Sequence, residues 1–257
     1  SYILYRQKRA ELRAARTALT DAVDAPGLDE CLAEIQQAFE GPEYSLTVLS
    51  GKFSSFLKSG MPRQEALGAL VKAAVELTTQ QAPKWEFIAA RLLNYKFELE
   101  LQAELEKRGI HTFYEKLRYL TDEGLYGTYI LERYSREELE QAASFLRPER
   151  NALFTYAGLD LQLKRYVIHT HQRVPLETPQ EMYLGIALHL AMEEKQDRLG
   201  WVQRFYDMLS KMEVTMATPT LSNARKPYHQ LSSCFIDTVP DSLEGIYRSL
   251  DNFAQVS

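Results

Sequence analysis

Apolar residues at helical spacing, interrupted by proline and glycine, constrain the fold of this chain more than any other feature of its sequence. Residues 3–22 are rich in Ala, Leu, Arg and Glu, which lose little side-chain freedom in a helix, and Pro26 and Gly27 end that helix. We expect further helices over residues 28–39, 45–58, 62–77, 85–107, 112–122, 136–147, 178–194 and 196–213. The chain is therefore predicted to be mainly α, with residues 28–107 forming a compact bundle.

Two of the expected helix starts carry capping boxes. Residues 135–138 and 178–181 each place Ser or Thr three residues before Glu, so that the hydroxyl and the carboxylate can bind free backbone N–H groups reciprocally. Between these helices, residues 166–169 are the best candidate for a short strand, paired with residues 172–176 around a turn. Near Thr215 the helical pattern gives way to residues that favour strands and turns.

Charge and hydropathy exclude several classes of protein. The formal net charge is -5 at pH 7, which argues against broad nucleic-acid binding, because affinity for the phosphate backbone needs a basic face. No apolar run approaches the roughly 18 residues that a membrane helix needs, and residues 1–6 lack the order of charge and apolar residues of a signal peptide. We therefore expect a cytoplasmic protein that binds neither nucleic acid nor membranes.

The chain has only two cysteines, Cys31 and Cys234, which excludes a disulfide scaffold and a zinc cluster made of cysteines alone. Cys31 lies at an apolar position of a predicted helix, so we interpret it as a small core residue. His169 and His171 form a close pair of histidines, but no acid or thiol lies near them in the sequence, and we expect no metal site there.

Residues 215–257 concentrate side chains suited to chemistry. Pro219 cannot donate a hydrogen bond and biases Thr218 towards an extended conformation, so a rigid turn is expected after the preceding helix. Such a turn can aim the hydroxyls of Thr218 and Ser222, with neighbouring backbone N–H groups, at a phosphate or diphosphate. The alternative is an ordinary Ser/Thr turn that satisfies only its own backbone.

Cys234 follows Ser232 and Ser233 in a run, residues 230–237, that favours a strand. A thiol used for exchange must reach its substrate and form thiolate, and small neighbours leave room for that approach. If Cys234 is redox-active, its partner thiol lies outside this sequence, because Cys31 is expected in the core. The alternative is a buried strand cysteine.

Asp241 heads the last expected helix. Its carboxylate can accept the first free N–H groups as an N-cap, and Glu244, three residues later, can reach back. The same positively polarised helix end can also hold an anion or a nucleotide. Apolar residues at helical spacing follow along residues 243–254; such a seam is usually core and less often a surface for a partner helix.

Taken as a whole, residues 216–237 closely resemble the first barrel strand and substrate loop of the large, catalytic subunit of class I ribonucleotide reductase. Residues 241–243 continue the resemblance, and residues 62–100 and 154–159 are similar to the helical domain and barrel approach of that family. The resemblance implies an N-terminal helical domain that leads into the first strand and helix of a ten-stranded α/β barrel. The implied parts are a helix following an ATP-cone, the helical domain and the start of the barrel, over residues 1–22, 23–160 and 161–257.

The same resemblance implies roles for individual residues. Cys234 would be one of two thiols that reduce the ribose 2′ position and leave as a disulfide. No residue of this chain would bind a metal, because the radical would come from a metal-bearing small subunit. The implied substrate-binding residues are Thr218, Ser222, Ser233 and Cys234, and the implied effector-binding residues are Asp241, Ser242, Leu243 and Ser257.

The implied activity is reduction of ribonucleoside diphosphates to deoxyribonucleoside diphosphates for DNA synthesis. The implied partners are the small (beta) subunit, a second copy of this chain through the effector-site helix, and thioredoxin or glutaredoxin as reductant, with ATP and deoxynucleoside triphosphates as effectors. Because the family's radical cysteine and second redox cysteine belong after residue 257, we expect this chain to be the N-terminal part of a larger enzyme. The alternatives are a non-catalytic nucleotide-binding regulatory or assembly fragment, and a vitamin-B12-dependent or glycyl-radical reductase.

Overall fold

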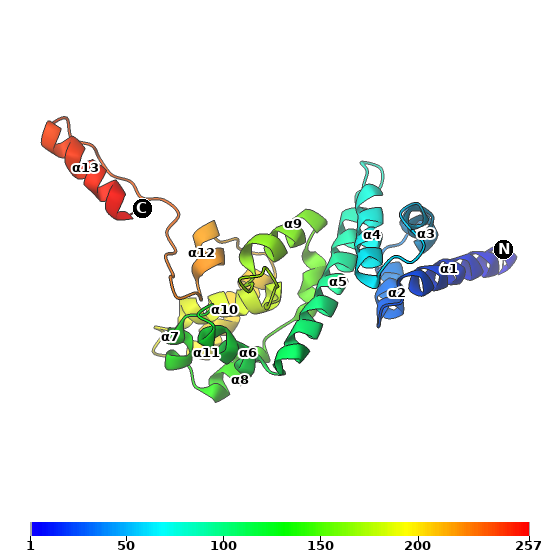
Figure 1. Cartoon of the computed structure of the whole chain (residues 1–257), viewed down its shortest axis with the longest axis horizontal. Coiled ribbons are helices and arrows are strands. Elements are labelled where there is room, and N and C mark those ends of the chain that lie inside the picture. Colours follow the sequence, from blue (N-terminus) through cyan, green and yellow to red (C-terminus); the bar gives the residue numbers. More distant parts are fainter. Residues whose placement is uncertain (1, 257) are drawn as a thin grey trace.

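The computed structural model describes residues 2–256, with side chains from residue 6 onward, and it is largely helical (Figure 1). The longer helices are α1 (Tyr2–Val23), α2 (Leu28–Ala38), α3 (Leu46–Ser54), α4 (Arg63–Glu76), α5 (Trp85–Arg108), α6 (Phe113–Asp122), α8 (Arg136–Ala143), α10 (Pro179–Ala191), α11 (Arg198–Ser210) and α13 (Leu243–Val256). The shorter ones are η1 (Pro42–Tyr44), α7 (Thr128–Arg133), η2 (Pro148–Leu153), α9 (Tyr156–Leu161), η3 (Gln162–Tyr166) and α12 (Thr218–Asn223). The prediction of a mainly α chain is confirmed. Within residues 2–256, no helix is both long and apolar enough to cross a membrane.

Helix α5 belongs to two clusters of buried apolar side chains. Its first half, which begins with the fully buried Trp85, packs with α1 to α4, and the Trp85 indole donates a hydrogen bond to the carbonyl oxygen of Glu43 at 3.0 Å. Its second half, from Phe97 onward, packs with the helices that follow it in the chain. Figure 1 shows α1 to α4 at one end of α5 and α6 to α8 at the other. The long helix thus connects the N-terminal bundle to the region that carries the candidate site.

Both predicted capping boxes are confirmed. The Ser135 hydroxyl accepts a hydrogen bond from the Glu138 amide at 3.2 Å, and the Glu138 carboxylate accepts one from the Ser135 amide at 2.8 Å. Thr178 and Glu181 make the same reciprocal pair at 3.1 and 2.8 Å. A third box, which the sequence analysis did not single out, begins α6. These boxes satisfy N–H groups that have no partner inside the helix, and so they define where the three helices begin.

The strand expected over residues 166–169 is reduced to a single antiparallel bridge between His169 and Pro175. The predicted pairing partner is right, because the Leu176 amide donates to the carbonyl oxygen of Ile168 at 2.9 Å. The Ile168 amide, however, donates to the carboxylate of Glu177 at 3.0 Å. A side chain therefore occupies a donor that a longer ladder would use.

The strand expected over residues 230–237 does not form among the described residues. This segment is exposed except for the half-buried Leu231, and residues 227–239 make no backbone-to-backbone hydrogen bonds within residues 2–256. A strand is stabilised by backbone pairing with a neighbour. Here only side chains of α12 reach the segment, at Gln230 and Leu231, and Figure 1 shows it running away from the helical body beyond that point. Local propensity alone does not make a strand here.

Helix α13 stands apart from the rest of the chain (Figure 1). The apolar seam predicted on residues 243–254 is present, but it is exposed rather than core: Leu243, Leu250 and Phe253 are 72%, 57% and 52% exposed. Only Gly245 and Ser249 are buried on this helix. An exposed apolar seam of this kind is typical of a surface that another protein covers.

Candidate functional site

Thr218 and Ser222 lie on α12, a short helix where the sequence predicted a turn. The turn prediction is wrong because Pro219 falls in the first helical turn, where its missing N–H has no intrahelical partner to lose. The spacing of four residues places both side chains on the same face of α12. Thr218 is exposed and Ser222 is half-buried, while Thr220 is buried on the opposite side of the helix. The two side chains therefore share one face of α12, and their binding of a diphosphate stays a prediction.

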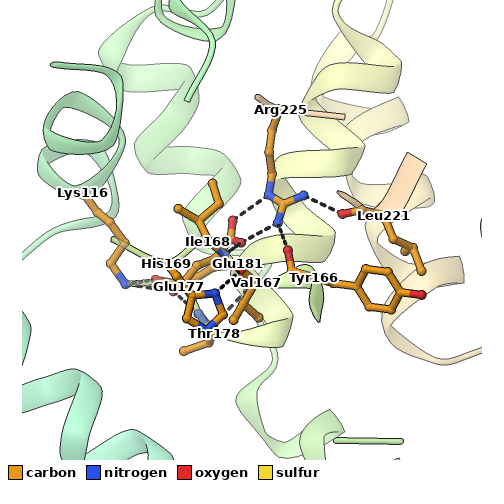
Figure 2. A network of polar contacts seen from close by, with 10 residues as sticks. All are labelled: Lys116, Tyr166, Val167, Ile168, His169, Glu177, Thr178, Glu181, Leu221 and Arg225. Carbon is orange, nitrogen blue, oxygen red and sulfur yellow. Dashed lines mark hydrogen bonds and ion pairs between the residues drawn. The ribbon is translucent and has the colours of Figure 1, made fainter. Parts of the chain in front are cut away.

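A fully buried ion pair anchors the end of α12 (Figure 2). Arg225 Nε donates to Glu177 Oε1 at 2.8 Å, and Arg225 Nη2 donates to Glu177 Oε2 at 2.6 Å. The same guanidinium donates to the carbonyl oxygens of Leu221 and Tyr166 at 2.8 and 2.9 Å. Burial opposes the charge on Arg225, but the Glu177 carboxylate outweighs that effect and holds the arginine pKa above its usual value.

A second ion pair lies close to the first at the start of α10. Lys116 Nζ donates to both carboxylate oxygens of Glu181 at 2.6 and 2.8 Å, and the two side chains are 7% and 13% exposed. Figure 2 shows this pair on the opposite side of the 166–169 segment from α12. The pair joins α6 to α10, and its side chains form hydrogen bonds to Thr178 and to each other rather than to α12, so it offers a comparison for the Arg225 pair.

Sequence reasoning missed Tyr166, Glu177 and Arg225 as parts of the site. Arg225 and Glu177 are 48 residues apart, so no local spacing connects them. Both are residue types that are usually exposed, and composition alone would place them on the surface. The only available signal was that Arg225 lies directly after the segment whose hydroxyls had been singled out.

Cys234 is exposed, next to Ser233, whose hydroxyl lies 3.7 Å from the Cys234 sulfur. The alternative of a buried strand cysteine is wrong for this structure. Cys31 is half-buried against the N-terminal cluster, and burial, together with the nearby charges of Glu34 and Glu98, raises its pKa to about 12. Because the thiolate is the reactive form, Cys31 is inert at neutral pH, and Cys234 is the accessible thiol of the two.

The start of α13 is capped by Ser242 and not by Asp241. The Ser242 hydroxyl accepts a hydrogen bond from the Gly245 amide at 3.1 Å. Glu244 does not reach back, since its carboxylate accepts a hydrogen bond from Arg248 at 2.8 Å. Asp241 is one residue too early to cap, because Ser242 supplies the carbonyl that accepts the first intrahelical bond, from Ile246 at 2.9 Å.

Loss of the Ser242 cap is expected to loosen the first turn of α13. Ser242→Ala leaves the Gly245 amide without its partner, at a cost of about 1 kcal/mol, so amide exchange over residues 243–247 should become about fivefold faster. Mass-spectrometric hydrogen exchange measures this directly. Asp241→Ala is the matched control and should change exchange much less; equal effects of the two substitutions would contradict the assignment of the cap.

The candidate effector residues are separated from the candidate substrate residues. Asp241, Ser242 and Leu243 are exposed at the start of α13, which Figure 1 places well away from α12. Ser257, the remaining candidate, lies outside the described residues. The structure thus brings Thr218 and Ser222 together, and Ser233 and Cys234 together, but does not unite all of the predicted residues in one pocket.

The larger hollows of the molecule do not coincide with these residues. A cavity of about 670 Å³ lies between α5, α6 and the start of α10, and none of the predicted site residues lines it. A smaller one, of about 310 Å³, reaches Leu221 at the buried side of α12. Within the described part of the chain, no three His, Cys, Asp or Glu side chains gather to hold a metal ion.

A cluster of three rings lies where the chain leaves α12. The Tyr129 hydroxyl lies 2.9 Å from His189 Nδ1 and donates to the carbonyl oxygen of Lys226 at 3.2 Å. The rings of His189 and His229 are 5.3 Å apart. Burial, with the nearby charge of His229, lowers the pKa of His189 to about 4.

Stability is therefore expected to fall in acid through His189. Because its pKa in the folded protein lies below the ordinary value of 6.5, the unfolded chain binds the proton more readily between pH 6.5 and about 4. The free energy of unfolding from urea titrations should drop as the pH falls through that window. His189→Gln should flatten this dependence, and the exposed His171→Gln should not. A slope that His189→Gln leaves unchanged would contradict the prediction.

Comparison with known proteins agrees with the features described above. Residues 152–229 match the family described as "Ribonucleotide reductase, all-alpha domain". The ribonucleoside-diphosphate reductase subunit alpha of Treponema pallidum is 60% identical over the whole of this chain. The chain belongs to the family of ribonucleotide reductase large subunits. It is also 34% identical over 76% of its length to the alpha subunit of Helicobacter pylori, and 30% identical over 82% of its length to that of Enterobacteria phage T4.

These relatives of the ribonucleotide reductase family are much longer than the chain described above. The chain spans 30% of the Treponema pallidum protein, 24% of the Helicobacter pylori protein and 28% of the phage protein. The matched family region, residues 152–229, contains α12, Glu177 and Arg225 and ends before Cys234. The buried ion pair and α12 thus lie within the segment that matches the all-alpha domain of the family.

Proposed function

We propose that this chain is part of the large subunit of a ribonucleoside-diphosphate reductase, which converts ribonucleoside diphosphates to deoxyribonucleoside diphosphates. The observation that carries the proposal is 60% identity along the whole chain to a protein of that name. Two features support it: the paired hydroxyls of Thr218 and Ser222 on one face of α12, and the exposed thiol of Cys234. The reaction needs a site for the diphosphate and a reducing thiol, and these residues supply candidates for both.

The chemistry assigns a defined task to Cys234. In each turnover the ribose 2′ hydroxyl leaves as water, and two thiols give up two electrons and two protons as they become a disulfide. Cys234 supplies one thiol, and the second lies outside this sequence, because Cys31 is half-buried on α2 against the N-terminal cluster. A dithiol of the thioredoxin or glutaredoxin type then restores the two thiols by exchange.

The remaining roles follow the same proposal. Thr218 and Ser222 hold the substrate diphosphate, and Ser233 lies beside the substrate. The effector, ATP or a deoxynucleoside triphosphate, binds at the start of α13, near Asp241, Ser242 and Leu243. A metal-bearing small subunit supplies the radical in the cytoplasm. The proposed parts of the chain are a helix following an ATP-cone over residues 1–22, the N-terminal helical domain over residues 23–160 and the start of the barrel domain over residues 161–257, with the match to the all-alpha family model running across residue 160.

The exposed seam of α13 supports a dimer of large subunits. Leu243, Leu250 and Phe253 are each more than half exposed, and burying them against the same residues of a second copy removes apolar surface from water. This observation also favours the second candidate function, a non-catalytic assembly module that keeps the dimer surface and the effector site. The two functions differ in whether substrate oxidises Cys234.

The test uses the full-length protein that contains this sequence, with its small subunit, a dithiol reductant and each effector. Formation of deoxyribonucleoside diphosphate, with substrate-dependent conversion of Cys234 to a disulfide seen by mass spectrometry, is the expected result. Effector binding and dimerisation without either reduction or Cys234 oxidation would overturn the reductase proposal and leave the assembly module.

A further inference from the structure

We propose that Tyr166 and the buried pair of Arg225 and Glu177 are positioning residues that hold the hydroxyl face of α12 where the substrate diphosphate binds. The inference rests on the proposed function and deepens it, because it assigns residues that act on the substrate through Thr218 and Ser222. None of the three would touch the reacting atoms. Their part is to fix the place and orientation of the helix that carries the binding hydroxyls.

Arg225 binds α12 at the C-terminal end of the helix. Its guanidinium is fully buried and donates to the carbonyl oxygen of Leu221, in the last turn of the helix, at 2.8 Å. The other donors go to Glu177 and to the carbonyl oxygen of Tyr166, so one side chain ties the helix to two other segments. The Arg225 carbonyl oxygen also accepts a hydrogen bond from the Gly127 amide at 2.8 Å. The end of α12 is therefore held at several points at once.

Tyr166 reaches both the anchor and the site. Its carbonyl oxygen accepts the Arg225 hydrogen bond, and its hydroxyl lies 3.3 Å from Thr218 Oγ1 at the other end of α12. The tyrosine is 6% exposed, whereas Thr218 is exposed. A buried phenol thus meets the hydroxyl proposed to bind the diphosphate, and it limits the rotamers that this hydroxyl group adopts.

The neighbouring helix α10 leaves room for this arrangement. A Cβ atom added at Gly185 would lie 2.7 Å from Arg225 Cδ and would also clash with the Tyr126 hydroxyl. Only a glycine at this position lets the arginine pass so near the helix backbone. The close approach ties the position of Arg225, and with it α12, to the packing of α10.

Energetics favour a positioning role over a simple stabilising one. Taking both charges out of water offsets most of what their attraction gains, so a buried ion pair is weak evidence for a stability function. Such a pair adds hydrogen bonds that form only in one relative orientation of the two side chains, and it therefore fixes that orientation. Anion binding by two hydroxyls depends on that geometry, because a small misplacement of binding groups weakens the bound state.

The experiment compares three variants of the full-length protein, assembled with its small subunit, under steady-state turnover. Tyr166→Phe removes only the hydroxyl beside Thr218. The double variant R225M/E177Q removes the anchoring charges without leaving one unpaired. The matched control K116M/E181Q removes the neighbouring ion pair, whose side chains form hydrogen bonds to Thr178 and to each other rather than to α12. Thermal unfolding of each variant separates effects on folding from effects on the substrate.

We expect the KM for ribonucleoside diphosphate to rise about threefold for Tyr166→Phe and about tenfold for the double variant, with a smaller change in kcat. The control K116M/E181Q should keep the wild-type KM, even if its thermal stability falls as much as that of R225M/E177Q. Provided that the wild type is active, the inference would be overturned by an unchanged KM in both site variants. It would also be overturned by a rise in the KM of the control equal to that of the double variant. If the double variant does not fold, Tyr166→Phe alone decides. A wild-type protein that reduces no diphosphate would overturn the proposed function and the inference with it.

Discussion

Cys234→Ser in the full-length protein should abolish multiple-turnover reduction of ribonucleoside diphosphates, by about a thousandfold or more. Two thiols give two electrons to the ribose as they become a disulfide, and a serine hydroxyl cannot take part in that step, so the proposed catalytic cycle loses its reductant. Folding should be nearly unchanged, because Cys234 is exposed and residues 227–239 make no backbone-to-backbone hydrogen bonds within the described residues. Turnover assays with a dithiol reductant, alongside thermal unfolding, measure the two effects separately.

The matched control is Cys31→Ser. This thiol is half-buried on α2, and its pKa of about 12 keeps it protonated at neutral pH. It should therefore leave turnover at the wild-type level, with at most a modest loss of stability from placing a hydroxyl against an apolar cluster. Multiple turnover that persists in Cys234→Ser, or that is lost in Cys31→Ser instead, would contradict the assignment of Cys234 as the redox thiol.

Long helices could be predicted from the sequence because their causes are local. Apolar spacing and breakers located α1 to α6, and the hydroxyl and carboxylate of a capping box lie within four consecutive residues. The short elements were missed because they contain too few residues for such local patterns to appear. Helix α12 has six residues, too few to show a period, and the turn residues Thr218 and Pro219 suit the first turn of a helix equally well.

The strand over residues 230–237 shows the limit of local propensity. Its residues favour an extended backbone, but a strand exists only when a second segment pairs with it, and none of the described residues does so here. Similarly, Asp241 and Ser242 are both good capping residues one position apart, and the choice between them depends on where the first helical hydrogen bond forms. Neither outcome can be read from side-chain chemistry alone.

Candidate binding residues could be named from the sequence, whereas the residues that hold them in place could not. Thr218, Ser222 and Cys234 stand in one recognisable stretch of sequence. Glu177 lies 48 residues before Arg225, and the two meet only because α10 and α12 pack together in the folded chain. Roles carried by distant partners of this kind are a property of the tertiary structure.

The largest loss of stability in this region is expected from breaking the Arg225 pair on one side. Arg225→Met leaves the Glu177 carboxylate, 2% exposed, without its partner, and should lower the free energy of unfolding by about 3 to 5 kcal/mol. The double variant R225M/E177Q should recover much of that loss, because an amide costs far less to bury than an unpaired charge and can still accept the Ile168 hydrogen bond. Urea unfolding of the two variants measures the difference.

An exposed pair provides the control for this stability prediction. Arg136 and Glu140 are 2.8 Å apart on α8 with side chains 60% and 48% exposed, so Arg136→Met should change stability far less than Arg225→Met. If Arg225→Met were as mild as Arg136→Met, the buried pair would not be holding a charge away from water. If the double variant were as damaged as the single one, the loss would come from the shape of the arginine side chain and not from the unpaired carboxylate. The loss of stability should therefore be largest for Arg225→Met, smaller for R225M/E177Q and smallest for Arg136→Met. This order tests whether charge compensation fixes Arg225 at the end of α12.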